Sequence, residues 1–100
     1  MTESELDPVI HAQARLRVVA TLASLAPHDS IAFAKLQQLL GMTPGNLSTH
    51  LRKLEDAEYV EVAKSFQGRS PVTHIALTAR GRLAFESYTE AVTKILGGTS

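Results

Sequence analysis

The chain has 100 residues, a formal net charge of zero and 44% hydrophobic residues. This length suits one domain that buries about two thirds of its unfolded surface, and the absence of cysteine excludes disulfides, thiolate metal ligands and a cysteine nucleophile. No apolar run approaches the ~18 residues of a membrane span, and no signal-peptide or lipidation pattern is present, so we expect a soluble cytoplasmic protein with no membrane partner.

The first predicted element is a long apolar helix. Residues 1–6 are acidic, and we expect them to form a disordered tail before a single domain over 7–96. Asp7-Pro8 supplies an N-cap and a first-turn proline, which predicts a helix from Val9 to Ala26. Its apolar arc is about twice the roughly 100° that a surface helix needs, which indicates burial on two sides.

Two further helices are predicted in close succession. The first covers 33–40 and ends at Gly41, which suits the left-handed residue that follows a helix. Its residues expected to face the core are Phe33, Leu36, Leu39 and Leu40. Thr43-Pro44 caps and opens the next helix, over 43–57. One apolar seam runs along that helix, made by Leu47, Leu51, Leu54 and Ala57. Two helices joined by a short turn with a glycine are typical of the helix-turn-helix, whose second helix enters the DNA major groove.

A β-hairpin is predicted next. Residues 59–66 and 72–77 alternate in polarity as strands do, a loop over 67–71 joins them, and 31–32 could add a brief third strand. The apolar residues expected to cover the helices are Val60, Val62, Ile75 and Leu77.

The last predicted helix has an apolar face that suggests an interface between two copies of the chain. Thr78 caps this helix, which should run to about Leu96 before a flexible tail over 97–100, and Leu83 is expected to point into the domain. Large exposed apolar faces usually mark interfaces, so we expect this helix and part of the first to form a two-fold dimer interface. The residues assigned to this interface are Val9, Ile10, Phe85, Tyr88, Val92, Ile95 and Leu96.

Two groups of residues are candidates for contact with DNA. The face of the 43–57 helix opposite its leucines carries small, polar and basic residues, which can approach base edges and phosphates. The candidates on this helix are Thr43, Pro44, Gly45, Asn46, Ser48, Thr49, His50, Arg52 and Lys53. The hairpin tip combines basic side chains with a glycine, which suits a minor groove or a phosphate. The candidates on the hairpin are Lys64, Gln67, Gly68, Arg69 and Ser70.

The net charge of zero counts against DNA binding, because phosphate neutralisation supplies much of the affinity of DNA-binding proteins. The charge is unevenly distributed, since residues 42–82 hold six basic side chains against four acidic ones. A protein–protein interaction module without sequence-specific DNA binding therefore remains the alternative function. Salt dependence distinguishes the two, because only binding through phosphates weakens steeply as salt rises.

Catalytic and metal chemistry find no support in the motifs. Ser48, Thr49 and His50 are consecutive, so on a helix they splay apart and cannot form a nucleophile–base pair. The four histidines lie in separate predicted elements without a cysteine, which does not suit a metal site. We therefore expect no enzyme activity, no metal and no cofactor.

The order of these motifs resembles a known family. GNLSTHLRKLE, EYVEV, FQGRSPVT and ALTARGR follow one another as in winged helix-turn-helix regulators of the MarR/ArsR type, in particular their compact stand-alone branch, and the resemblance covers about residues 7–96. It implies an α+β, mainly α fold with a three-helix core, a two- to three-stranded β wing and a C-terminal dimerisation helix. It also implies a homodimer that represses transcription from a palindromic operator in double-stranded DNA. Many ArsR-type members sense metals through Cys and His clusters, and this chain has no cysteine. A small-molecule effector stays undetermined.

Overall fold

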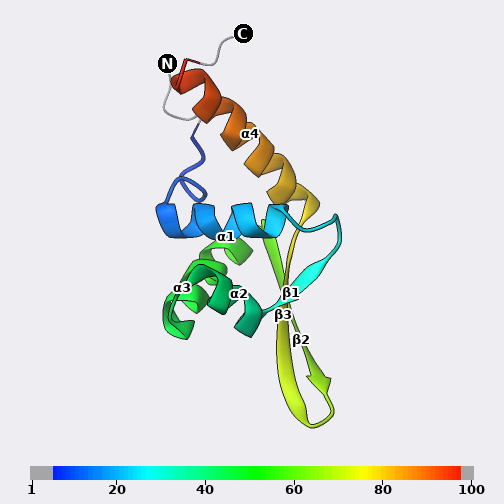
Figure 1. The fold of residues 1–100 in the computed structure, drawn as a ribbon. Helices are drawn as coiled ribbons and strands as arrows, with labels where there is room; N and C mark the ends of the chain where they lie inside the picture. Colours follow the sequence, from blue (N-terminus) through cyan, green and yellow to red (C-terminus); the bar gives the residue numbers. More distant parts are fainter. Residues whose placement is uncertain (1–5, 98–100) are drawn as a thin grey trace.

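The computed structural model describes residues 6–97, and over this range it contains four helices and a three-stranded antiparallel sheet. In chain order the elements are α1 (Gln13–Ala23), β1 (Ser30–Ala32), α2 (Phe33–Leu40), α3 (Pro44–Asp56), β2 (Val60–Gln67), β3 (Ser70–Leu77) and α4 (Ala79–Ile95). The molecule is elongated, 52 × 25 × 22 Å, with α4 extending at one end and the β2–β3 hairpin at the other (Figure 1). The predicted tails over 1–6 and 97–100 lie outside the described residues except for Leu6 and Gly97.

The first helix is shorter than predicted. Asp7-Pro8 begins a single turn and not a helix, because the Asp7 carboxylate accepts a hydrogen bond from the Val9 amide (2.8 Å) and the Asp7 carbonyl accepts from the Ile10 amide (3.1 Å). This turn buries Ile10, and Ala12 then takes an extended conformation before α1 starts. The helix prediction over residues 9–12 and 24–26 was therefore wrong, and an aspartate that satisfies its own neighbouring amides explains the error at the first end.

The three helices α1, α2 and α3 surround a leucine-rich core. Gly41 ends α2 in the left-handed region (φ 66°), and the Thr43 hydroxyl accepts a hydrogen bond from the Asn46 amide (3.1 Å) at the start of α3. Both signals were predicted from the sequence. The core members on α2 and α3 are Leu36, Leu40, Leu47, Leu51 and Leu54. Leu39 was expected to join them and is instead exposed, because it points away from the other helices.

The sheet has the order β1-β3-β2, and its hairpin is longer than predicted. Pairing continues to Gln67 and Ser70, so the turn is only Gly68-Arg69, with Gly68 at φ 66°. The loop predicted over 67–71 is thus mostly strand. The sheet residues buried against the helices are Val60, Ile75 and Leu77, while Val62 is half-buried. The outer half of the hairpin therefore extends beyond the core.

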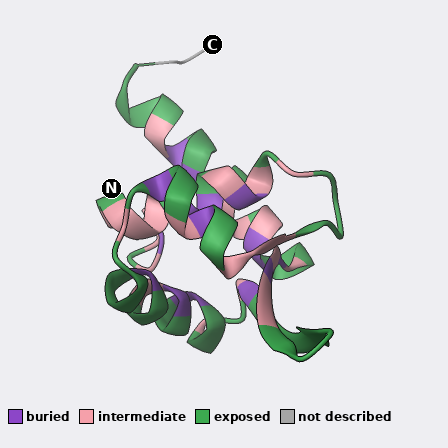
Figure 2. Cartoon of the chain, turned by 60° about the horizontal axis from the view of Figure 1, so that its bottom comes forward, coloured by how far each residue is buried: buried purple, intermediate pink, exposed green. Residues whose placement is uncertain are grey.

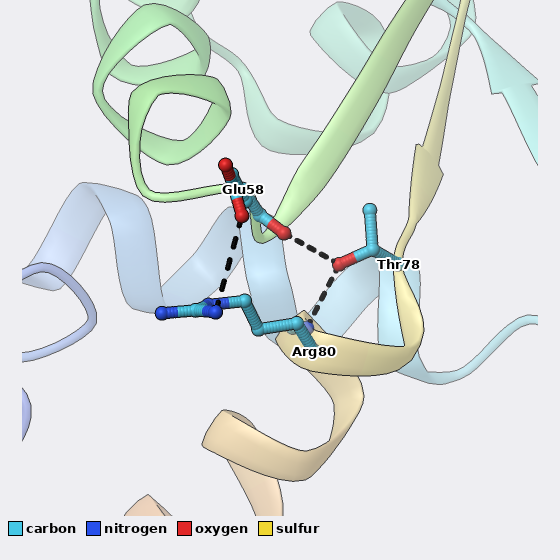
Figure 3. A network of polar contacts seen from close by, with 4 residues as sticks. Glu58, Thr78 and Arg80 are labelled. Atoms are coloured by element: carbon cyan, nitrogen blue, oxygen red, sulfur yellow. Dashed lines mark hydrogen bonds and ion pairs between the residues drawn. The ribbon is translucent and has the colours of Figure 1, made fainter.

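A compact polar junction joins α3, β2 and α4 (Figure 3). The Thr78 hydroxyl accepts from the Gly81 amide (2.9 Å) as the N-cap of α4 and donates to the Glu58 carbonyl (2.7 Å). Glu58 lies just after α3 with φ 66°, and its carboxylate is 3.9 Å from the Arg80 guanidinium. Gly81 is buried against the Tyr59 carbonyl. Leu83, two residues further on, is exposed and does not enter the domain as predicted, because α4 turns this side outward.

Candidate nucleic-acid interface

The outer face of α3 is accessible along its whole length (Figure 2). The predicted residues that lie exposed on it are Thr43, Pro44, Gly45, Asn46, Ser48, Thr49, Arg52 and Lys53. The Thr49 hydroxyl donates to the Gly45 carbonyl (3.0 Å), so its oxygen is left to accept a hydrogen bond from outside. Apart from its chain neighbours and the nearby backbone of the same helix, nothing lies within 4 Å of where a Cβ would stand on Gly45, so the backbone of the first turn of α3 is open to a ligand.

Apolar packing and a hydrogen bond from α1 fix the position of α3. Leu47, Leu51 and Leu54 are buried, which holds the helix on the core by its apolar seam. Arg17 on α1 donates to the Leu40 carbonyl (2.8 Å) at the end of α2, where a cation also complements the helix dipole. The turn from α2 to α3 is therefore tied to α1, and the polar face of α3 is presented in one orientation.

His50 differs from its neighbours on α3. Its side chain is half-buried, and its Nδ1 is shielded from solvent with no hydrogen-bond partner in the part of the chain that is described. The ring is therefore turned partly inward, and less of it is available to a ligand than of Ser48 or Thr49. Its contact with DNA stays a prediction.

The hairpin and α3 form the two walls of one groove. Ser48 and Arg52 from α3 and Lys64 from β2 line this groove of about 420 Å³. The other predicted hairpin residues, Gln67, Gly68, Arg69 and Ser70, are exposed at the tip, further from α3. The structure thus brings part of both predicted groups together, and it places the tip as a separate contact region.

Phe66 was not among the residues selected from the sequence. It lies one residue before the tip segment and is 74% exposed, an unusual position for a large apolar ring. The signal was present in the alternation of β2, because Val62, Lys64 and Phe66 share one strand face.

Acidic side chains lie both in the groove and beside it. Glu58 and Glu61 line a second hollow of about 660 Å³ with Arg80, and Glu55 lies between the two hollows and lines both. Both hollows therefore mix basic and acidic groups, with Glu55 beside Arg52 and Lys64 in the first and Arg80 beside Glu58 and Glu61 in the second.

Tyr59, at the junction, is half-buried beside the Asp7 carboxylate. Burial and the hydrogen bond that its hydroxyl donates to the Asp7 carboxylate raise the pKa of Tyr59 to about 12. Both causes favour the protonated hydroxyl. Tyr59 thereby holds the N-terminal turn against the start of β2 and acts as a structural residue.

The predicted interface residues fall into three groups by exposure. Ile10 and Tyr88 are buried within the chain, and the Tyr88 hydroxyl is 2.9 Å from Nδ1 of His11. The half-buried members are Val9, Phe85 and Val92. Ile95 and Leu96 are 61% and 78% exposed. Ile10 offers no free surface to a partner, so an interface would be built on the last turns of α4.

Over residues 6–97, no cluster of three or more His, Asp or Glu side chains could hold a metal ion. No helix in this range is long and apolar enough to span a membrane.

Comparison with known proteins agrees with this geometry. A family model for a winged helix DNA-binding domain matches residues 14–96. An uncharacterized protein of Methanocaldococcus jannaschii, MJ0432, is 35% identical over 80 residues, which cover 80% of this chain and 84% of that protein. A transcriptional regulator homologue from Pyrococcus horikoshii OT3 has a similar structure, with a TM-score of 0.82, 26% identity, and coverage of 92% of this chain and 88% of that one. MepR of S. aureus, solved in complex with DNA, aligns with a TM-score of 0.74 and 18% identity over 93% of this chain and 73% of that one, and shows the shared fold.

The fold and the exposed α3–hairpin face define a winged-helix protein of the type found in MarR-like transcriptional regulators. The chain belongs to the winged helix DNA-binding domain family. The winged-helix family and fold predicted from the sequence are thereby confirmed.

Proposed function

We propose that the protein binds double-stranded DNA sequence-specifically through α3 and the hairpin. The observation that carries this proposal is the groove in which Ser48 and Arg52 of the predicted recognition helix face Lys64 of the hairpin. Helix and hairpin thereby present hydrogen-bonding and cationic groups toward the same space, which Glu55 also lines. The open first turn of α3 would allow its backbone to approach base edges, and the exposed Arg52 would contact a guanine or a phosphate.

The hairpin tip supplies a second contact in this proposal. Arg69 stands in the two-residue turn, about 20 Å beyond the pair of Val62 with Ile75 at ~3.3 Å per residue. From there its guanidinium would reach a minor groove or phosphates beside the segment read by α3. Arg69 should therefore contribute mainly sequence-independent affinity.

The protein would act as a homodimer through α4. Tyr88, Val92 and Ile95 follow one another at helical spacing on one face, so the buried face of α4 continues into its exposed last turns. Exposed apolar side chains in that position suit a second copy of the same helix. Two recognition helices about one DNA turn apart, ~34 Å, would read a palindromic operator, and occupancy of a promoter would repress transcription.

The first experiment is selection of bound duplexes from a random DNA pool at about 150 mM salt. Enrichment of an inverted repeat is expected. On the selected site, Arg52→Ala should relax base preference at one position by about 1–3 kcal/mol, and Arg69→Ala should weaken binding evenly across sequences. Arg80→Ala is the matched control, because it removes the same exposed charge at the α4 junction. Unchanged affinity in both Arg52→Ala and Arg69→Ala would show that the assigned face is wrong.

The dimer is tested separately by sedimentation. Ile95→Glu with Leu96→Glu should give a folded monomer that binds the selected site more weakly, because both side chains are exposed within one chain. Lys94→Glu changes the charge by the same two units on the side of α4 away from Tyr88, Val92 and Leu96, at an exposed position, and should leave the dimer intact. A wild-type protein that sediments as a monomer on and off DNA would refute the dimer.

A further inference from the structure

The inward face of β2 changes character along the strand. Val60 is buried and Val62 is half-buried, while Lys64 and Phe66, next on the same face, are exposed. The face is therefore a continuous stripe that packs on the helices at one end and leaves them at the other. The exposed end of this stripe points toward the groove, because Lys64 lines the groove opposite Ser48 and Arg52.

Phe66 has no packing role within the described chain. Its cross-strand neighbour is Pro71, which is also exposed, and the core ends at the pair of Val62 with Ile75. The ring lies about 7 Å beyond Lys64 along the strand, at ~3.4 Å per residue. An aromatic ring with 74% of its surface free, beyond the part of the hairpin that packs on the core, indicates a partner outside the chain.

The surroundings of the ring indicate the chemistry of that partner. Lys64 precedes it, and Gln67 and Arg69 follow it, all of them exposed. A partner that accepts an apolar ring between two cations must offer an apolar surface bordered by negative charge. The DNA minor groove does so, with sugar walls and base edges between two rows of phosphates, and apolar side chains of DNA-binding proteins wedge into it between base steps.

We propose that Phe66 is a further DNA-contacting residue, which packs its ring into the minor groove beside the segment read by α3. This inference rests on the proposed function, because it takes duplex DNA as the partner of the hairpin. Pyrimidine–purine steps unstack most easily, so Phe66 confers a preference for such a step in the DNA flanking the recognised half-site. The polar residues around Phe66 hold the hairpin on the phosphates, while its ring favours DNA steps that are easily unstacked.

The test compares Phe66→Ala with wild type on the selected duplex by fluorescence anisotropy at several salt concentrations. About a tenfold loss of affinity is expected, with an unchanged salt slope, because an apolar contact displaces no counterions from phosphates. Arg69→Ala should instead reduce the salt slope by about 1. Ser65→Ala, on the opposite face of β2, is the matched control and should bind as wild type does.

A second readout follows the DNA itself. With 2-aminopurine at the flanking step, wild-type protein should raise the fluorescence through unstacking, and Phe66→Ala should not. Phe66→Leu should retain part of both effects, since a smaller apolar side chain still enters the groove. Wild-type affinity in Phe66→Ala, with Arg52→Ala impaired, overturns this inference and leaves the proposed function standing. Absence of DNA binding by the wild-type protein overturns both.

Discussion

Gly81 is the glycine at which we expect an added methyl group to lower the free energy of unfolding most. It lies in the first turn of α4 and is buried against the start of β2. A Cβ built there would overlap the Tyr59 carbonyl oxygen and would stand 2.9 Å from Cδ1 of Leu77. The carbonyl cannot simply retreat, because it accepts a hydrogen bond from the Thr78 amide (3.0 Å). Gly81→Ala must therefore separate α4 from β2 or break that bond.

The size of the effect follows from three contributions. Overpacking against backbone belongs at the upper end of the roughly 1–3 kcal/mol range for added methylenes. Loss of the Thr78 to Tyr59 hydrogen bond adds about 1 kcal/mol. The better helix propensity of alanine returns about 1 kcal/mol. The free energy of unfolding should thus fall by about 3 kcal/mol, which corresponds to a decrease in Tm of about 12–24 °C for a domain of this size.

Thermal unfolding followed by circular dichroism measures this directly. Gly45→Ala is the control, because it adds the same methyl group to the first turn of α3, where nothing beyond its chain neighbours and the nearby backbone of the same helix lies within 4 Å. Its Tm should equal or slightly exceed that of the wild-type protein, since alanine is favoured over glycine in a helix. A Gly81→Ala variant that melts within a few degrees of wild type would refute the packing argument at the junction.

Three further predictions concern single residues. Thr43→Ala removes the N-cap of α3 and should lower the free energy of unfolding by about 1 kcal/mol, measured by urea denaturation; an unchanged midpoint would mean that the cap does not stabilise α3. Glu58→Gly relieves a left-handed backbone and removes only an exposed ion pair, so it should raise stability by about 0.5 kcal/mol; a lower urea midpoint would contradict this. The pKa of Tyr59, raised to about 12, means that its contribution to stability is fully present below about pH 10 and is lost as pH rises through 12. Tyrosinate absorbance should show this late titration, and Asp7→Asn should move the pKa part of the way back toward 10; no movement would exclude the Asp7 contribution.

Local signals predicted the centre of the fold well. Each cap, Thr43 and Thr78, binds an amide three residues further along the chain, and Gly41 adopts its left-handed conformation directly after α2. The leucine seam of α3 follows from helical spacing. A short stretch of sequence is therefore enough to recognise each of these features. These signals were enough to place the α3 face that forms one wall of the groove.

The errors arose where distant contacts decide the structure. Asp7 has the local features of a helix cap, yet its carboxylate is shared between the Val9 amide and the hydroxyl of Tyr59, 52 residues away. The hairpin continues past the predicted strand ends because Gln67 pairs with Ser70 across a two-residue turn. Only the paired structure shows that Phe66 extends beyond the core and that Lys64 faces Arg52.

The connection between β3 and α4 contains a single residue. β3 ends at Leu77, α4 begins at Ala79, and Thr78 between them is fixed by bonds to Glu58, Tyr59 and Gly81. α4 therefore extends rigidly from the domain, because no flexible segment separates it from β3. In the proposed dimer, the connection between β3 and α4 would set the distance and the rotation between the two recognition helices. These would not adapt to the DNA. Such a dimer would bind only operators whose half-site spacing matches this fixed geometry. One residue inserted between β3 and α4, which turns a helix by about 100°, would misalign the two recognition helices with the DNA.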